Sequence, residues 1–409
     1  MNRTSLTAAL VAVPTAALAL SGCVAKADLA ASGGPLTVTS DATTCQVSTA
    51  KATSGTLAFT VTNKGPQITE FYLLADDALR IVGEVENIAP GASRTLTVVA
   101  QPGNYFTLCK PGMIGQGVGK AAFTVTGDTV AITGEDAEQK QQAVTLYAAF
   151  VKDQTAQLLP AVRSFTEDYA AGRDDAARAA FPKVRAYYER IEPIAEALGD
   201  LDPRIDYREV DAKAEGLDWT GFHRIEKDLW VPAKDAKNSD DSPAWKDWEP
   251  STPQQRVTHA SALVADVQQL YDYVHGNDFA TSLNEQGVAG LSNGAISLLD
   301  EVATTKITGE EDWWSGTDLY DFAANVEGSK MAFSLVRDFT LSKGDAGKKL
   351  VAEIDKGYAA LEKSLADHGS AERGFTTFAD LTDADKRALI DDINALAEPL
   401  SKLTTTILG

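Results

Sequence analysis

Histidine and cysteine are both scarce in this sequence. The 409 residues include four His and three Cys, and no His precedes His223. A type-1 copper centre requires two His and one Cys as ligands. The chain before His223 therefore cannot form such a centre from its own side chains.

Positive charge is also in short supply. The chain has 37 Lys and Arg against 58 Asp and Glu, which gives a formal net charge of −21. Nucleic-acid binding depends on basic surface, so this balance argues against it. An acidic protein attracts cations instead. We also find no convincing Ser-His-Asp grouping, phosphate-binding loop or dinucleotide motif.

Only one long apolar run is present, and it lies at the N-terminus. Arg3 precedes an apolar stretch from Leu6 to Leu20 that is short for a membrane span. It ends in Leu20-Ser21-Gly22-Cys23, which has the form of a lipobox. We predict that residues 1–23 are a lipoprotein signal peptide and that Cys23 is lipidated, which would anchor an exported protein to a membrane surface. Plain secretory cleavage is the alternative.

The other two cysteines are Cys45 and Cys109. An even pair in an oxidising compartment favours a disulfide, which in the chain-entropy account would contribute roughly 4 kcal/mol. The alternative is a pair of thiolate metal ligands.

A short flexible tether (24–35) precedes a region with β-strand patterning (36–127). Runs of Val, Thr, Phe and Leu alternate there with turn signals such as Pro90-Gly91 and Pro102-Gly103. The expected strands include 56–62, 70–74, 80–85, 94–99 and 121–126. About seven strands at this spacing indicate a β-sandwich.

The remainder of the chain has helical periodicity. A polar linker (128–136) leads into a predicted all-α bundle (137–409). Val144, Tyr147 and Val151 mark the face of a first long helix. Further helices are expected over 176–198, 221–231, 253–274, 290–304, 319–339, 349–367 and from 383 to the C-terminus. A long polar loop (232–254) interrupts them.

The stretch from Gly221 to Trp230 carries the most informative pattern. On a helix, its apolar residues form one arc, with His223 at the edge of that arc and Glu226 within it. Arg224, Lys227 and Asp228 fall on the other side. His223 and Glu226 are neighbours at spacing i, i+3. A carboxylate that faces a core needs a cation, which is either another side chain or a bound metal.

Several longer motifs follow one another along the chain. They are Glu86-Asn87-Ile88-Ala89-Pro90-Gly91, Tyr188-Glu189-Arg190-Ile191-Glu192-Pro193, Gly221-Phe222-His223-Arg224-Ile225-Glu226-Lys227, Thr305-Lys306-Ile307-Thr308-Gly309-Glu310-Glu311-Asp312 and Asn325-Val326-Glu327-Gly328. In this order they resemble the EfeO family of extracytoplasmic iron-uptake proteins. The resemblance implies a multidomain β + α chain: a cupredoxin-like Greek-key β-sandwich followed by an imelysin-like helical bundle.

The resemblance also implies a function. The HxxE motif of the family falls on His223 and Glu226, and Glu327, Glu311 and Asp240 are the further acidic ligands that we expect. The cargo would be iron, ferric or ferrous, with other divalent cations as further candidates. The expected partners are an EfeU-like membrane permease and an EfeB-like haem peroxidase.

Two other functions stay open at this point. A metallopeptidase would need His259 or His275 as a second imidazole ligand, and the helix lacks the second His of HExxH. A cation-bridged polysaccharide-binding protein could use the tryptophans at 245, 248, 313 and 314. In the β-rich region, Glu70, Glu84 and Glu86 could offer a separate site for a hard cation.

Overall fold

The computed structural model describes residues 36–131, 136–304 and 306–408. The predicted signal peptide (1–23), Cys23 and the tether (24–35) lie outside the described residues. Within the described ranges, no helix combines the length and the apolar composition needed to cross a membrane.

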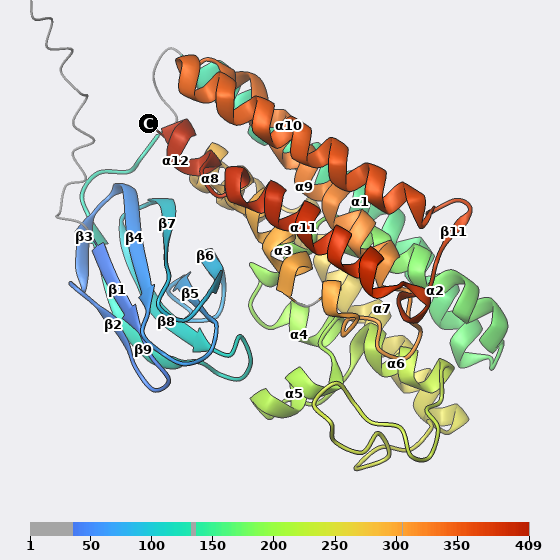
Figure 1. Cartoon of the computed structure of the whole chain (residues 1–409). Helices are drawn as coiled ribbons and strands as arrows, with labels where there is room; N and C mark the ends of the chain where they lie inside the picture. Colours follow the sequence, from blue (N-terminus) through green and yellow to red (C-terminus); the bar gives the residue numbers. More distant parts are fainter. Residues whose placement is uncertain (1–35, 132–135, 305, 409) are drawn as a thin grey trace, which may run out of the picture. The chain divides into compact units, whose positions relative to one another are not determined.

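The described part of the chain has β-structure first and helices after it, which confirms the predicted fold class (Figure 1). We call residues 36–131 the β part and residues 136–408 the helical part. One sheet of the β part has the order β2 (Cys45–Val47), β1 (Leu36–Ser40), β4 (Gly55–Asn63) and β7 (Ser93–Ala100). The other has the order β3 (Lys51–Thr53), β9 (Val118–Thr126), β8 (Gly103–Pro111), β5 (Thr69–Leu74) and β6 (Ile81–Ile88). The sequence predicted about seven strands, and the structure adds very short ones such as β2 and β3, which carry too few residues to show alternation.

The core of the β part lies around three phenylalanine rings. Phe59 of β4 has its ring centroid 5.3 Å from that of Phe71 and 5.5 Å from that of Phe123. Cys45 and Cys109 form a disulfide between a strand of each sheet. This confirms the predicted pairing and removes both thiols from consideration as metal ligands.

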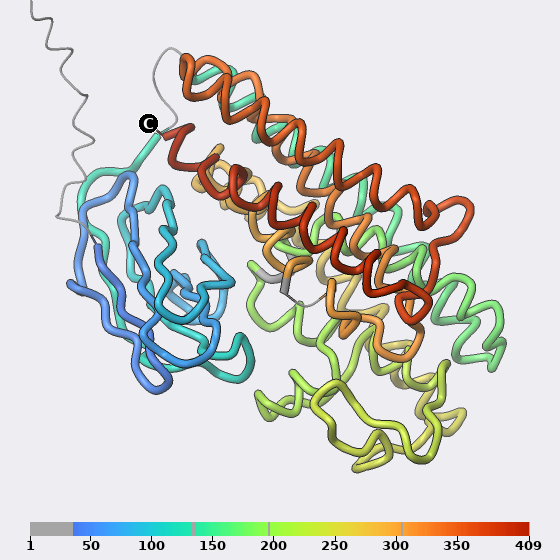
Figure 2. The backbone as a smooth tube through the Cα atoms, viewed as in Figure 1, coloured from blue at the N-terminus to red at the C-terminus, as the bar shows by residue number. Residues whose placement is uncertain are grey.

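The helical part contains long helices joined by shorter elements (Figures 1 and 2). The helices before the long loop are α1 (Ala137–Ala170), α2 (Asp174–Glu189), α3 (Glu192–Glu196), α4 (Leu201–Ile205), α5 (Glu209–Glu215) and α6 (Gly221–Leu229). Those after it are α7 (Pro253–His275), α8 (Asn277–Thr304), α9 (Asp318–Leu341), α10 (Gly344–Asp367), α11 (Asp383–Leu400) and α12 (Leu403–Leu408). Short 3₁₀ turns (Lys306–Thr308 and Phe378–Asp380) and a two-stranded ribbon, β10 (Gly369–Ser370) with β11 (Gly374–Phe375), complete it.

Four helices differ from the sequence expectation. Helix α10 begins five residues before the predicted start at 349, and the helix predicted from 383 to the C-terminus is two helices, α11 and α12. The helix predicted over 176–198 is two helices, because the chain leaves helical hydrogen bonding at Arg190 and resumes at Glu192, just before Pro193. Helix α8 begins 13 residues before the predicted start at Gly290, and Gly287 interrupts it with φ 57° and ψ −149°. A positive φ suits glycine, which lacks a Cβ, so the interruption falls where the chain tolerates it.

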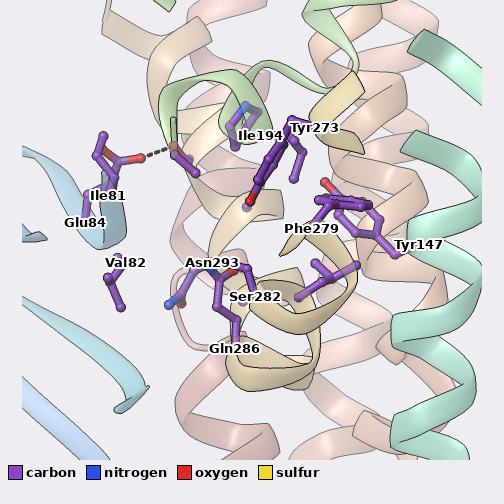
Figure 3. Close-up of a pocket in the computed structure, with 17 residues that line it drawn as sticks. Ile81, Val82, Glu84, Tyr147, Ile194, Tyr273, Phe279, Ser282, Gln286 and Asn293 are labelled. Carbon is purple, nitrogen blue, oxygen red and sulfur yellow. Dashed lines mark hydrogen bonds between the residues drawn. The ribbon is translucent and has the colours of Figure 1, made fainter. Parts of the chain in front are cut away.

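A pocket beside α8 is lined by Tyr147 of α1, Tyr273 of α7, and Phe279 and Gln286 of α8 (Figure 3). These helical side chains are aromatic or amide groups. Among the described residues, the one carboxylate that lines this pocket is Glu84, which accepts a hydrogen bond from the Ser297 hydroxyl at 2.8 Å. One carboxylate without an imidazole does not make a metal centre of the predicted kind.

The disulfide generates a first prediction. Replacing both Cys45 and Cys109 by Ser should lower the free energy of unfolding of the β part by roughly 4 kcal/mol, because the cross-link restricts the unfolded chain. Hydrogen exchange measured by mass spectrometry should become faster in β4, β5 and β9. Exchange in helix α10 serves as the internal control and should not change. Unchanged exchange in these strands would contradict the prediction.

Candidate metal centre

The position of α6 depends on the glycine at its first residue. Gly221 has φ +82°, and a Cβ built there would lie 2.1 Å from the carbonyl oxygen of Ile205. The preceding Thr220 donates its hydroxyl to the carbonyl oxygen of Arg204 at 2.8 Å. Helix α6 therefore starts directly against the end of α4. As a result, His223 is brought close to Asp206, the residue that follows α4.

Every residue of α6 is buried. Arg224, Lys227 and Asp228, which the helical pattern placed away from the apolar arc, are therefore buried as well. The residues after α6 fold back over this side of the helix: the Lys227 ammonium lies 4.9 Å from the ring centroid of Trp248, and Asp228 accepts a hydrogen bond from the backbone N–H of Ser251 at 3.0 Å. The polar side of α6 is covered by chain whose position the helical pattern could not show.

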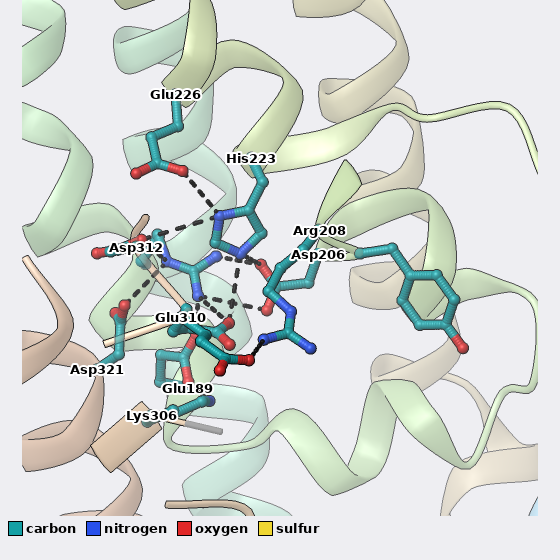
Figure 4. A network of polar contacts seen from close by, with 12 residues as sticks. Glu189, Asp206, Arg208, His223, Glu226, Lys306, Glu310, Asp312 and Asp321 are labelled. Carbon is teal, nitrogen blue, oxygen red and sulfur yellow. Dashed lines mark hydrogen bonds and ion pairs between the residues drawn. The ribbon is translucent and has the colours of Figure 1, made fainter. Parts of the chain in front are cut away.

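His223 is surrounded by carboxylate oxygens (Figure 4). Its Nδ1 lies 3.1 Å from Oε2 of Glu226 and 3.9 Å from Oδ1 of Asp312. Its Nε2 lies 3.3 Å from Oε1 of Glu311 and 3.5 Å from Oδ1 of Asp206. Both ring nitrogens thus face acidic groups, and the imidazole is 2 % exposed.

Glu226 has partners on both oxygens. Oε2 contacts His223, and Oε1 accepts hydrogen bonds from the backbone N–H groups of Trp314 and Ser315 at 3.0 and 2.8 Å. Among the described residues, no Arg or Lys forms an ion pair with Glu226. These contacts hold the segment that carries Glu311 against α6. The inward carboxylate is thus met by imidazole and backbone donors.

The main cation of the cluster is Arg185 of α2, which the sequence analysis did not identify. Its guanidinium group is fully buried. It forms ion pairs or hydrogen bonds with five carboxylates: Glu189 at 2.5 Å, Asp206, Glu311 at 3.1 Å, Asp312 at 3.5 Å and Asp321 at 3.2 Å. The only sequence signal for Arg185 is its position on the apolar face of α2, between Phe181 and Tyr188.

Carboxylates outnumber cations in this cluster. Seven buried acids, Glu189, Asp206, Glu226, Glu311, Asp312, Asp318 and Asp321, surround Arg185 and His223, and a third buried basic group, Lys306, pairs with Glu189 at the edge of the cluster. Asp318 and Asp321 come from the first turn of α9. Burial raises the pKa of Asp312 and of Asp321 well above the ordinary value, and the two carboxyl groups are hydrogen-bonded to each other. Within the described ranges, Asp318 Oδ2 has no hydrogen-bond partner, so this oxygen leaves capacity for a further cation.

The surplus of acids shifts several pKa values. Burial and the Arg185 charge act to lower the pKa of His223, but hydrogen bonds with Glu226 and Glu311 outweigh them and raise it to about 10. Burial raises the pKa of Asp318 to about 7. Burial opposes ionisation of Glu311 as well, but the charges of Lys306 and His223 hold its pKa well below the usual range.

At neutral pH, His223 is therefore an imidazolium in the metal-free protein. Its raised pKa stabilises the fold: this contribution is fully present below the ordinary value of 6.5 and is lost as the pH rises through about 10. A metal ion that uses this imidazole as a ligand has to displace its proton.

The structure brings some of the predicted ligands together and not others. His223, Glu226 and Glu311 lie in one cluster. Glu327, on α9, is half exposed and pairs with Arg190 at 2.8 Å. Asp240 lies in the loop after α6, where its Oδ1 accepts a hydrogen bond from the backbone N–H of Ser242 at 2.9 Å. Glu327 and Asp240 thus have partners elsewhere.

Two sets of three residues place their ligand atoms within 4.8 Å of one another around the imidazole. They are Asp206 with His223 and Glu311, and His223 with Glu226 and Asp312. Neither His259 nor His275 joins such a set among the described residues. The second imidazole of a His₂Glu zinc site is therefore not assembled in the part of the chain that the structure describes.

A pocket leads to the cluster. His223, Glu226 and Glu311 line it together with Trp219, Trp313, Trp314, Arg208, Asn238 and other residues. Asn238 belongs to the long loop after α6, and Trp313 is 40 % exposed. The loop predicted from its length and its prolines thus forms part of the wall of this pocket.

Comparison with known proteins shows the family of this chain. The imelysin family model (Peptidase_M75) matches residues 143–403. "Iron uptake system component EfeO" of Escherichia coli (strain K12) is 36% identical over 367 residues, which cover 88% of each chain. The chain belongs to the EfeO family.

The same figures hold for the EfeO of Shigella flexneri. Among solved structures, an imelysin-like protein from Psychrobacter arcticum 273-4 aligns with a TM-score of 0.47 and 11% identity. The alignment covers 68% of this chain and 98% of that one. The helical part described above is the region that the imelysin model matches.

The contact at Gly221 generates a second prediction. Gly221→Ala should lower the melting temperature for two reasons. The new Cβ would clash with the backbone of Ile205, and alanine disfavours the left-handed φ of this position. Gly216→Ala is a matched control: its φ is +73° but no atom lies within 4 Å of the added Cβ. Gly216→Ala should lower the free energy of unfolding by about 1 kcal/mol through φ alone. Gly221→Ala should lower it by clearly more. Equal melting temperatures by circular dichroism would refute the packing role.

Proposed function

We propose that this chain is the iron-binding component of an EfeO-type uptake system. It captures iron, ferric or ferrous, outside the cytoplasm and delivers it to a membrane permease. The observation that carries the proposal is the convergence of His223 and a surplus of buried carboxylates on one pocket-lined cluster.

The donor set suits iron. Imidazole is a common iron ligand, and carboxylate oxygens suit hard cations. His223, Glu226 and Glu311 are the first candidates as ligands, with Asp206 and Asp312 as the acids nearest to the same ring nitrogens. The relatives named as iron uptake components support iron rather than another divalent cation as the cargo.

The transport context comes from the family and from the N-terminal sequence. A permease of the EfeU type would accept the iron, and a haem peroxidase of the EfeB type would act alongside it. Cys23, in the lipobox, would carry the lipid that holds the chain at the membrane. We expect no nucleic-acid partner, in keeping with the acidic composition of the chain.

Removing either of two central residues tests the proposal. His223→Ala and Glu226→Gln should each weaken Fe²⁺ binding at least about 100-fold, because each removes a candidate ligand or its charge. Glu226→Gln keeps an oxygen for the backbone N–H groups of Trp314 and Ser315, so the local fold should persist. Anaerobic titration calorimetry measures the affinity, and far-ultraviolet circular dichroism measures helix content.

His259→Ala is the control for this pair. His259 lies on α7, outside the sets of converging ligand atoms. Its replacement should leave Fe²⁺ binding within about twofold of the parent chain. Unchanged affinity in both His223→Ala and Glu226→Gln would remove the assignment.

Proton release provides an independent test. The pKa of His223 is raised to about 10, so Fe²⁺ binding through this imidazole at pH 7 should release about one proton or more. The apparent affinity should then rise with pH, by up to about tenfold per unit below pH 10. Calorimetry at pH 7 in two buffers of different ionisation enthalpy counts the protons. A count of zero would show that His223 keeps its proton and is not a ligand.

A further inference from the structure

Arg185 lies at the middle of the candidate metal centre. The guanidinium group presents five N–H donors in a planar fork and has no acceptor. Its carbon lies 5.8 and 5.5 Å from the ring centroids of Phe181 and Phe222. Between these rings and the five carboxylates, the group is fully enclosed.

The oxygens that Arg185 contacts are the oxygens that face His223. Oε1 of Glu311 lies 3.1 Å from Arg185 Nη2 and 3.3 Å from His223 Nε2. Oδ1 of Asp206 accepts a hydrogen bond from Arg185 Nη1 and lies 3.5 Å from His223 Nε2. Oδ1 of Asp312 lies 3.5 Å from Arg185 Nε and 3.9 Å from His223 Nδ1. Three oxygen atoms are thus shared between the guanidinium and the imidazole.

This sharing has two consequences for a cation at His223. A metal ion that draws on the shared oxygens would lie near the guanidinium, and like charges repel strongly in a buried site. Without any cation, however, the same carboxylates would be buried without a counter-charge, which is strongly destabilising. The guanidinium therefore stabilises the empty site and opposes the filled one.

We infer that Arg185 is an internal counter-cation that competes with the cargo metal. It holds the carboxylates together while the site is empty, and it weakens metal binding so that the cargo can leave. The inference rests on the proposed function, since it concerns the same site, but it does not require Arg185 to be a ligand.

The test compares Fe²⁺ binding by Arg185→Gln with that of the parent chain under anaerobic conditions. Arg185→Gln should bind Fe²⁺ at least about tenfold more tightly, and release to an added chelator should be slower by a similar factor. Arg185→Lys keeps the charge and should stay closer to the parent chain than to Arg185→Gln. Lys183→Gln, which removes an exposed positive charge from the same helix, is the matched control and should change neither quantity.

Thermal unfolding supplies a second measurement. Metal-free Arg185→Gln should melt below the parent chain, and saturating Fe²⁺ should raise its melting temperature more than it raises that of the parent chain. If Arg185→Gln does not fold without metal, refolding in Fe²⁺ should restore helical circular dichroism. Failure of Fe²⁺ to restore it would overturn the inference, as would affinity equal to or weaker than that of the parent chain.

The outcomes separate this inference from the proposed function. A parent chain that binds no Fe²⁺ overturns the proposed function. If Arg185→Gln then binds Fe²⁺, the counter-cation role is supported on its own. If neither binds, both are overturned. Tight binding by the parent chain with no gain in Arg185→Gln overturns only the inference about Arg185.

Discussion

The burial of more carboxylates than cations around one imidazole is the constraint on which the helical part depends. Ionised carboxylates are costly to remove from water unless cations and donors meet them. Here α2 supplies Arg185, α6 supplies His223, and the backbone after Asp312 donates to Glu226. None of these elements by itself supplies enough cations and hydrogen-bond donors for the buried carboxylates, so the cluster forms only when all of them are in place.

The charge network continues beyond the imidazole. Glu189 contacts Arg185 with Oε1 and Lys306 with Oε2. Lys306 also pairs with Glu192 at 2.9 Å and Glu301 at 3.1 Å. The two buried cations are therefore linked through one carboxylate. Buried charges are weakly screened, so the charge of Arg185 and that of Lys306 both act on Glu189.

The tryptophans near the centre mostly serve the packing of the long loop. Trp245 donates its ring N–H to the carbonyl oxygen of Ala233 at 3.0 Å, and its ring lies edge-on to Trp248 at 5.1 Å. Trp313 donates to the carbonyl oxygen of Lys237 at 2.8 Å. These contacts hold the loop against the pocket. A role in stacking on sugars draws no support from Trp245 and Trp248, whose rings pack edge to face against each other.

Much of the architecture could be predicted from residue patterns. Alternation with turn signals predicted the strands, helical periodicity predicted α1, α7 and α9 closely, and the scarcity of cysteine pointed to the Cys45–Cys109 pair. The HxxE spacing identified His223 and Glu226, because residues three apart on a helix are neighbours whatever surrounds them. Glu311 followed from the family resemblance. These features depend on local chain geometry or on motifs, which a sequence carries directly.

The rest depends on contacts between distant segments. Arg185, Asp206, Asp312 and Asp321 are separated by up to 136 residues, and no periodicity relates them. Whether Glu327 or Glu311 reaches the imidazole depends on how α9 and the segment before it pack, and whether Lys227 is covered depends on the loop after α6. These contacts depend on the burial of charge in the folded chain, because a buried acid is tolerated only beside the particular cation that the fold brings to it.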